Sequence, residues 1–228
     1  MSISAAHLNR IVAAFLAGLA LVTPLAAPAQ DLPVPPGVMP DPTAPAMPAP
    51  GPPEPGAQPI DPTAETAQSR AEKLDALFAE LADPDAPDWE RAEQDIWREW
   101  SKSGSAPMDL LLQRGRAAMN NGDFPAAIEH LTALIDHAPD FAEGYNARAT
   151  AYYSAGQFGP SLSDIRRTLV LNPRHFGALS GLGMILEELE KPEDALFAYE
   201  AARAIHPHQP GVLEAIKRLH AQLDGQTL

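Results

Sequence analysis

The histidines are the first residues whose chemistry and grouping could form a site, because imidazole is a common metal ligand. The candidates by position are His130, His137, His175, His206 and His208. No carboxylate stands at a fixed motif spacing from them, and the chain has no cysteine to complete a ligand set. We therefore interpret them as surface or packing residues, and we expect no metal site and no other cofactor.

Glu187, Glu188 and Glu190 could be considered as a general acid and base pair. Adjacent positions on one helix do not face each other, so a solvated, charged helix end explains this cluster better. The sequence also has no Ser-centred elbow, HExxH, Walker loop or GxGxxG motif. These observations predict that the protein is not an enzyme.

The overall charge limits the partners. Thirty acidic against 16 basic residues give a formal net charge of −14. A nucleic-acid-binding face needs clustered Lys and Arg, so the composition argues against nucleic acid. The absence of cysteine excludes disulfides, thiolate catalysis and a lipid-modified N-terminal cysteine.

The first 29 residues are typical of a secretory signal peptide. Arg10 precedes the uncharged apolar run Ile11–Val22, and Ala27-Pro28-Ala29 supplies an Ala-x-Ala site, which predicts cleavage after Ala29. The alternative is an uncleaved anchor. Twelve helical residues rise only about 18 Å, which is short of a hydrocarbon core of about 30 Å. We expect export across the inner membrane to the periplasm, with no stable membrane span after cleavage.

Residues 30–62 form a proline-rich segment. Thirteen prolines lie between Asp31 and Pro62, and no aromatic residue accompanies them. Such a segment cannot bury enough apolar area to fold, so it is predicted to be a disordered, extended linker. The alternative is a ligand for a proline-binding domain.

Residues 63–107 are predicted to form an acidic helical hairpin. Leu74, Leu77, Phe78 and Leu81 take helical spacing before Asp83-Pro84, and a second helix carries all three tryptophans: Trp89, Trp97 and Trp100. Eleven acidic and four basic residues lie between Thr63 and Trp100. The Trp face can be interpreted as closing the core of the helices after residue 107, or as an acidic docking surface with aromatic anchors.

An internal repeat of 34 residues dominates the rest of the chain. Four positions of the repeat recur at this period. One is a terminating proline, two are small residues, and one is a large apolar residue. The proline and small-residue positions are Pro139, Pro173 and Pro207; Gly115, Ala149 and Gly183; Ala127, Ser161 and Ala195. The large residues are Leu131, Ile165 and Tyr199. Small residues at these two places indicate helices that approach closely.

This pattern resembles the tetratricopeptide repeat (TPR) family, of an exported bacterial type. The resemblance covers three units, residues 108–141, 142–175 and 176–209, and implies an all-α, right-handed superhelical solenoid of antiparallel helix pairs. Residues 210–228 are predicted to form a capping helix and tail, because Val212, Ile216 and Leu219 share one face. Arg114 and Arg148 replace the usual Leu, and Ser161 replaces Ala, so we expect looser packing there or an ion pair with a nearby carboxylate.

The family resemblance implies a peptide-binding groove on the concave face formed by the first helix of each pair. Its predicted residues here are Arg116, Met119, Asn120, Asn146, Thr150, Tyr153, Ser180, Met184 and Glu187. Polar groups that can bond a peptide backbone are mixed with adaptable methionines. Arg116 and Asn146 resemble parts of a carboxylate clamp, but the third unit supplies no Lys or Arg to complete it.

These features together predict a monomeric, non-enzymatic scaffold of the periplasm or cell envelope that binds a polypeptide. The alternative is a structural, self-assembling envelope protein that uses the Trp-rich hairpin.

Overall fold

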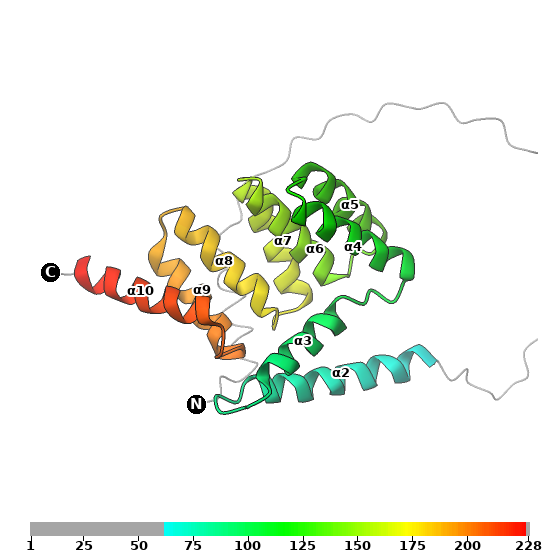
Figure 1. The fold of residues 1–228 in the computed structure, drawn as a ribbon, viewed down its shortest axis with the longest axis horizontal. Coiled ribbons are helices and arrows are strands. Elements are labelled where there is room, and N and C mark those ends of the chain that lie inside the picture. The colour runs from blue at the N-terminus through cyan, green and yellow to red at the C-terminus, as the bar shows by residue number, and fades with distance from the viewer. Residues whose placement is uncertain (1–61, 227–228) are drawn as a thin grey trace, which may run out of the picture.

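The computed structural model describes residues 62–226, and all regular structure in this part is helical (Figure 1). The predicted signal peptide and all of the proline-rich segment except Pro62 lie outside the described residues. The helices are α2 (Pro62–Leu81), α3 (Trp89–Trp100), α4 (Ala106–Asn120), α5 (Phe124–His137), α6 (Ala142–Ser154), α7 (Phe158–Leu171), α8 (Phe176–Glu188), α9 (Pro192–Ile205) and α10 (Pro210–Gln226). Within residues 62–226, none of the helices combines the length and the apolar character needed to cross a bilayer.

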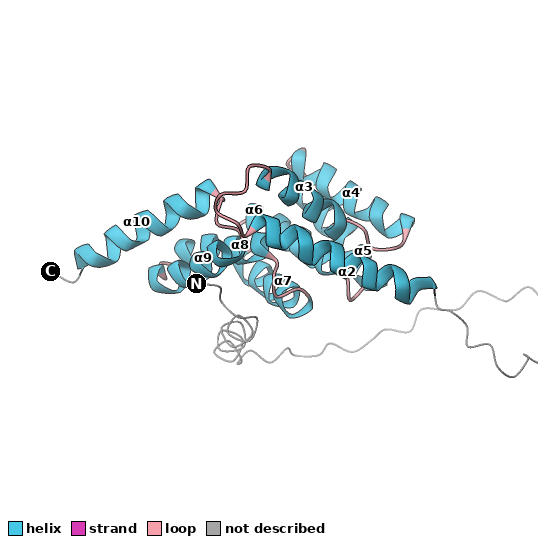
Figure 2. Cartoon of the chain, turned by 90° about the horizontal axis from the view of Figure 1, so that it is seen from below, coloured by secondary structure: helices cyan, strands magenta, loops and turns pink. Residues whose placement is uncertain are grey.

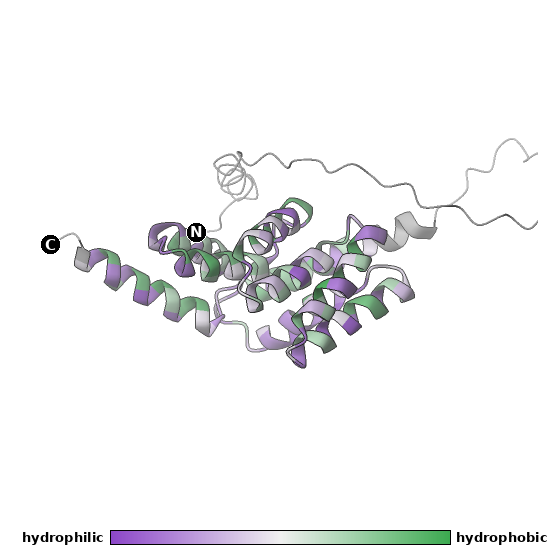
Figure 3. Ribbon diagram, turned by 90° about the horizontal axis from the view of Figure 1, so that it is seen from above, coloured by the Kyte–Doolittle hydropathy of each residue, from purple (hydrophilic) through white to green (hydrophobic). Residues whose placement is uncertain are grey.

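Three helix pairs, α4–α5, α6–α7 and α8–α9, succeed one another as a solenoid, and α10 packs on the last of them (Figure 1). The hydrophobic residues of α10 lie along one side of the helix and the hydrophilic ones along the other (Figure 3). Val212, Ile216 and Leu219 are buried, so α10 covers the open end of the repeat core.

The small residues of the repeat lie where the helices of a pair touch. A Cβ added to Gly115 would lie 2.5 Å from Leu131 Cγ, and one added to Gly183 would lie 2.6 Å from Tyr199 Cε1. Ala127 and Ala195 are fully buried. In each of these pairs, therefore, the large residue of the second helix packs on the small residue of the first helix.

Each pair turns at a residue with positive φ, at the same place in all three units. Gly122 has φ 75°, Gly156 has φ 71° and Glu190 has φ 56°. In each turn this residue's N–H bonds back to a carbonyl three positions earlier, which completes a helix C-cap. The third unit makes this turn with a residue that carries a Cβ.

In the second unit, the two residues that depart from the family pattern, Arg148 and Ser161, are hydrogen-bonded to nearby groups. Arg148 donates from Nε and Nη2 to both carboxylate oxygens of Asp164, at 2.7 and 2.9 Å. The Ser161 hydroxyl donates to the Ala149 carbonyl at 2.7 Å. Arg114, which occupies the corresponding place in the first unit, is exposed.

The α2–α3 hairpin precedes the first repeat in the chain, but its buried apolar residues share a core with the second and third repeats. Leu77, Phe78, Leu81 and Ile96 share one buried cluster with α7, α8, α9 and α10, while α4 and α5 form a second cluster with α6. In two perpendicular views, the hairpin lies along one side of the stacked pairs (Figures 1 and 2). The hairpin thus braces the solenoid from the side.

Candidate functional site

The side formed by α4, α6 and α8, here called the concave face as the family resemblance predicts, contains a cavity of about 180 Å³ between α6 and α8. Five of the nine residues predicted for the groove line it: Asn146, Thr150, Tyr153, Ser180 and Met184. Successive turns of α6 and α8 place these side chains on the same face. Ile165 and Ser161 of α7 complete the cavity wall.

The cavity combines an apolar wall with hydrogen-bonding groups. Met184 is 44% exposed, so its flexible thioether side chain is accessible to a ligand. The hydroxyl of Tyr153 has no hydrogen-bond partner among the side chains of residues 68–225 or the described backbone, and burial, followed by the charges of Glu188 and Glu187, raises the pKa of Tyr153. The phenol therefore stays protonated and can donate to a ligand.

The groove residues predicted in the first unit lie outside this cavity. Arg116 donates from Nη2 to Glu143 at 2.5 Å and from Nη1 to the Ser101 hydroxyl at 3.0 Å. Met119 packs on the core cluster of α4 and α5, and Asn120 is exposed at the end of α4. Arg116 thus joins α4 to α6 and to the residue after α3.

Glu187, the last predicted groove residue, anchors the end of α8. Tyr199 donates to its carboxylate at 2.8 Å, and Arg218 of α10 forms an ion pair with it. The hydrogen bond from Arg218 is the main reason that the pKa of Glu187 is lowered. This carboxylate is therefore charged and already paired.

Sequence reasoning missed the central roles of Glu143 and His175. Glu143 is 3% exposed and accepts from Arg116, from Asn146 at 3.3 Å and from His175 Nε2 at 3.0 Å. His175 caps α8, because its Nδ1 accepts the Ala178 N–H at 3.1 Å. Nδ1 must then be unprotonated, so the proton lies on Nε2 and points to Glu143. The sequence signal for this role was the position of His175 immediately before a predicted helix, where a side chain can cap the helix.

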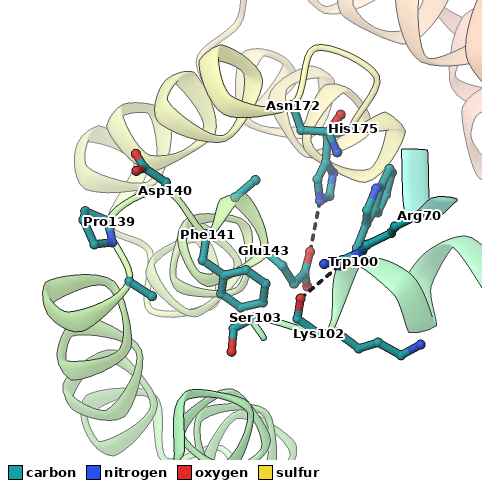
Figure 4. A pocket seen from close by; sticks show the side chains of 12 residues that line it. Arg70, Trp100, Lys102, Ser103, Pro139, Asp140, Phe141, Glu143, Asn172 and His175 are labelled. Carbon is teal, nitrogen blue, oxygen red and sulfur yellow. Dashed lines mark hydrogen bonds and ion pairs between the residues drawn. The ribbon is translucent and has the colours of Figure 1, made fainter. Parts of the chain in front are cut away.

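This polar group borders a second cavity of about 420 Å³ between the hairpin and the first two repeats (Figure 4). Trp100 stacks on His175 on one side, and Phe141 and Asn172 line the cavity from the repeat turns. Arg70 approaches from α2 and donates to the Lys102 carbonyl at 2.9 Å. The polar side chains at this cavity are already bonded to other groups of the protein. Together with the Trp100–His175 stack, they fix the hairpin to the repeats.

The tryptophans of α3 point toward the repeats. Trp97 and Trp100 contact Phe176, with ring centroids 5.3 and 5.1 Å apart, and Trp89 stacks on His208 at 4.9 Å. This arrangement favours the interpretation in which the Trp face closes the core. Among the side chains of residues 68–225, no group of three or more His, Asp or Glu is placed to hold a metal ion.

Comparisons with known proteins agree with this architecture. A family model described as tetratricopeptide repeat matches residues 112–159 and 146–210. A TPR repeat-containing protein of Rhizobium etli is 36% identical over 160 residues, which are 70% of this chain and 78% of that protein. The small glutamine-rich tetratricopeptide repeat-containing protein 2 of Saccharomyces cerevisiae is 30% identical over 131 residues, which are 58% of this chain and 37% of that protein.

Solved structures show the same fold. The first TPR of Spaghetti (RPAP3), solved with an HSP90 peptide, aligns with a TM-score of 0.51 at 24% identity and covers 53% of this chain and 95% of that one. The Sgt2 TPR domain of Aspergillus fumigatus aligns with a TM-score of 0.51 at 22% identity, over 54% and 83% of the two chains. With its 34-residue helix pairs and its similarity to the Rhizobium protein, the chain belongs to the tetratricopeptide repeat family.

Proposed function

We propose that the protein is a non-enzymatic, monomeric scaffold that binds a segment of another polypeptide on its concave face. The observation that carries this proposal is the cavity between α6 and α8, which is lined by the exposed Met184, by Tyr153 and by Asn146. An apolar wall with a few hydrogen-bonding groups suits an extended peptide, which presents side chains and backbone groups together. The similarity to the RPAP3 domain, whose structure contains a peptide, supports the same class of function.

We also propose that the scaffold works in the periplasm. Arg10, the apolar run Ile11–Val22 and the Ala27-Pro28-Ala29 site support export and cleavage. The intact mass of protein purified from the native cells should correspond to a chain that begins at Gln30. A full-length species in the cytosolic fraction would contradict the proposed location.

The binding face can be tested by placing a photo-crosslinking amino acid at Thr150, which is exposed on the α6 wall of the cavity. Val170 on α7 provides the control, since it is 52% exposed and lies outside this cavity. Irradiation of cells should give adducts from position 150 and few from position 170. Adducts from position 170 alone would assign binding to another face.

A further inference from the structure

A third cavity, of about 340 Å³, continues the groove toward the C-terminal helix. Trp89 and Glu93 of α3 form one wall, and His206 and Gln209 form another. Ser180 and Met184 of α8 belong to the walls of both this cavity and the one between α6 and α8. A polypeptide lying on the concave face can therefore place a side chain in the third cavity.

Glu93 differs from three buried or partly buried carboxylates of the same region, Glu143, Glu187 and Glu99. Glu143 pairs with Arg116, Glu187 pairs with Arg218, and Glu99 pairs with Lys73 and Lys102. Within the described residues, no Lys or Arg side chain pairs with Glu93, whose side chain is 29% exposed. Its polar neighbours are the Trp97 indole N–H at 3.4 Å and His206 Nε2 at 3.5 Å. A partly desolvated carboxylate without a cation favours a positively charged ligand.

His206 strengthens this preference. It is 1% exposed, and neither of its ring nitrogens has a hydrogen-bond partner among the described residues. Unsatisfied buried polar groups are uncommon in folded proteins, and a water molecule or ligand bound nearby is one explanation of them. Burial lowers the pKa of His206 although the charge of Glu93 acts in the opposite direction, so the imidazole is neutral and leaves Glu93 uncompensated.

The remaining walls suit the same ligand class. The Trp89 ring, which stacks on His208, also lines this cavity, and aromatic rings attract cations. The Met184 thioether provides a flexible apolar contact for an aliphatic stem. We propose that this cavity binds the cationic side chain, Lys or Arg, of the polypeptide held on the concave face. The inference rests on the proposed function of that face and adds the chemical class of residue that the partner must supply.

The test uses the full chain and two blocked probe peptides, acetyl-Gly-Gly-Arg-Gly-Gly-amide and the same peptide with citrulline. Citrulline keeps the shape of arginine but removes its charge. NMR titration should show the arginine peptide shifting the Trp89 indole and Met184 methyl signals, with affinity about tenfold or more above that of the citrulline peptide. Acetylation ensures that a free N-terminal amine does not provide the charge.

Glu93→Gln keeps the acceptor for the Trp97 indole and should lower the affinity for the arginine peptide by about tenfold. Glu90→Gln is the matched control, because Glu90 is exposed on the same helix outside the cavity. Equal titration of both peptides, or no shift at Trp89 and Met184, would overturn the cation site. Crosslinking from position 150 tests the proposed function separately, because it does not depend on a charged ligand.

Discussion

The indole of Trp100 lies nearly flat on the imidazole of His175, with ring centroids 4.2 Å apart and 18° between the ring planes. Trp100 ends α3, and His175 caps α8 while donating to Glu143 of α6. One stacked pair therefore joins the hairpin to the second and third repeats. This contact fixes the hairpin beside the groove. Because Glu93 lies on the same helix as Trp100, the contact also fixes the position of Glu93.

Trp100→Ala should destabilise the fold by about 3–5 kcal/mol, because it removes a buried aromatic ring from between His175 and Phe176. Leu110→Ala, at an exposed position of α4, should cost less than about 0.5 kcal/mol. Urea denaturation followed by circular dichroism measures both values. Similar effects for the two variants would mean that the hairpin is not part of the cooperative core.

Glu190→Gly should stabilise the protein by about 0.5–1 kcal/mol. An L-residue in the left-handed region costs roughly 1–2 kcal/mol, and the greater chain entropy of glycine offsets part of the gain. Gly156→Ala, at the equivalent turn of the second unit, should have the opposite sign. Melting temperatures of the two variants measured side by side check the prediction, which fails if both shift in the same direction.

Arg148→Ala should cost about 2–3 kcal/mol, because it leaves the buried Asp164 carboxylate without its bidentate partner. The value is below the roughly 3–5 kcal/mol of a fully buried pair, since Arg148 retains some solvent contact. Arg114→Ala provides the matched control at the same repeat position and should change stability by less than about 0.5 kcal/mol. Equal free energies of unfolding would rule out a specific role for the ion pair.

Much of the solenoid could be predicted because its determinants are local and periodic. Close helix contact requires Gly115 and Gly183 to be small, and the same requirement recurs every 34 residues. The second unit also provides the carboxylate that the sequence suggested for Arg148, and it is Asp164. The end of α2 at Leu81, before Asp83-Pro84, results from the inability of proline to continue a helix.

The contacts between the hairpin and the third repeat could not be predicted in the same way. Trp89 and His208 stack although they are far apart in the sequence, and no spacing rule links them. Arg116 shows the consequence for the site. Its repeat position predicts a groove residue, but Glu143 and Ser101 engage its guanidinium, so it is a structural link in the described part of the chain.

Acid should weaken the hairpin through Glu99. Hydrogen bonds from Lys102 and Lys73 lower the pKa of Glu99 to about 2. A carboxyl whose pKa is lower in the folded state stabilises the fold above its unfolded pKa of about 4.3, and this contribution is lost as the pH falls toward 2. The free energy of unfolding should therefore decrease between about pH 4.3 and pH 2. Glu99→Gln should flatten that decrease, whereas Glu90→Gln at an exposed position should not.

The central claim is that the concave face between α6 and α8 binds the partner polypeptide. The most direct measurement is the Kd of the crosslinked partner segment for Tyr153→Ala, with Val170→Ala as the control. Tyr153→Ala should weaken binding by about tenfold or more, because it removes an aromatic anchor together with its hydroxyl. Its ring also packs on Phe158 and the core, so the melting temperature should fall, and the Kd is measured at a temperature at which circular dichroism shows the variant to be folded. Val170→Ala should bind normally. Unchanged binding by Tyr153→Ala together with a loss in Val170→Ala would contradict the claim.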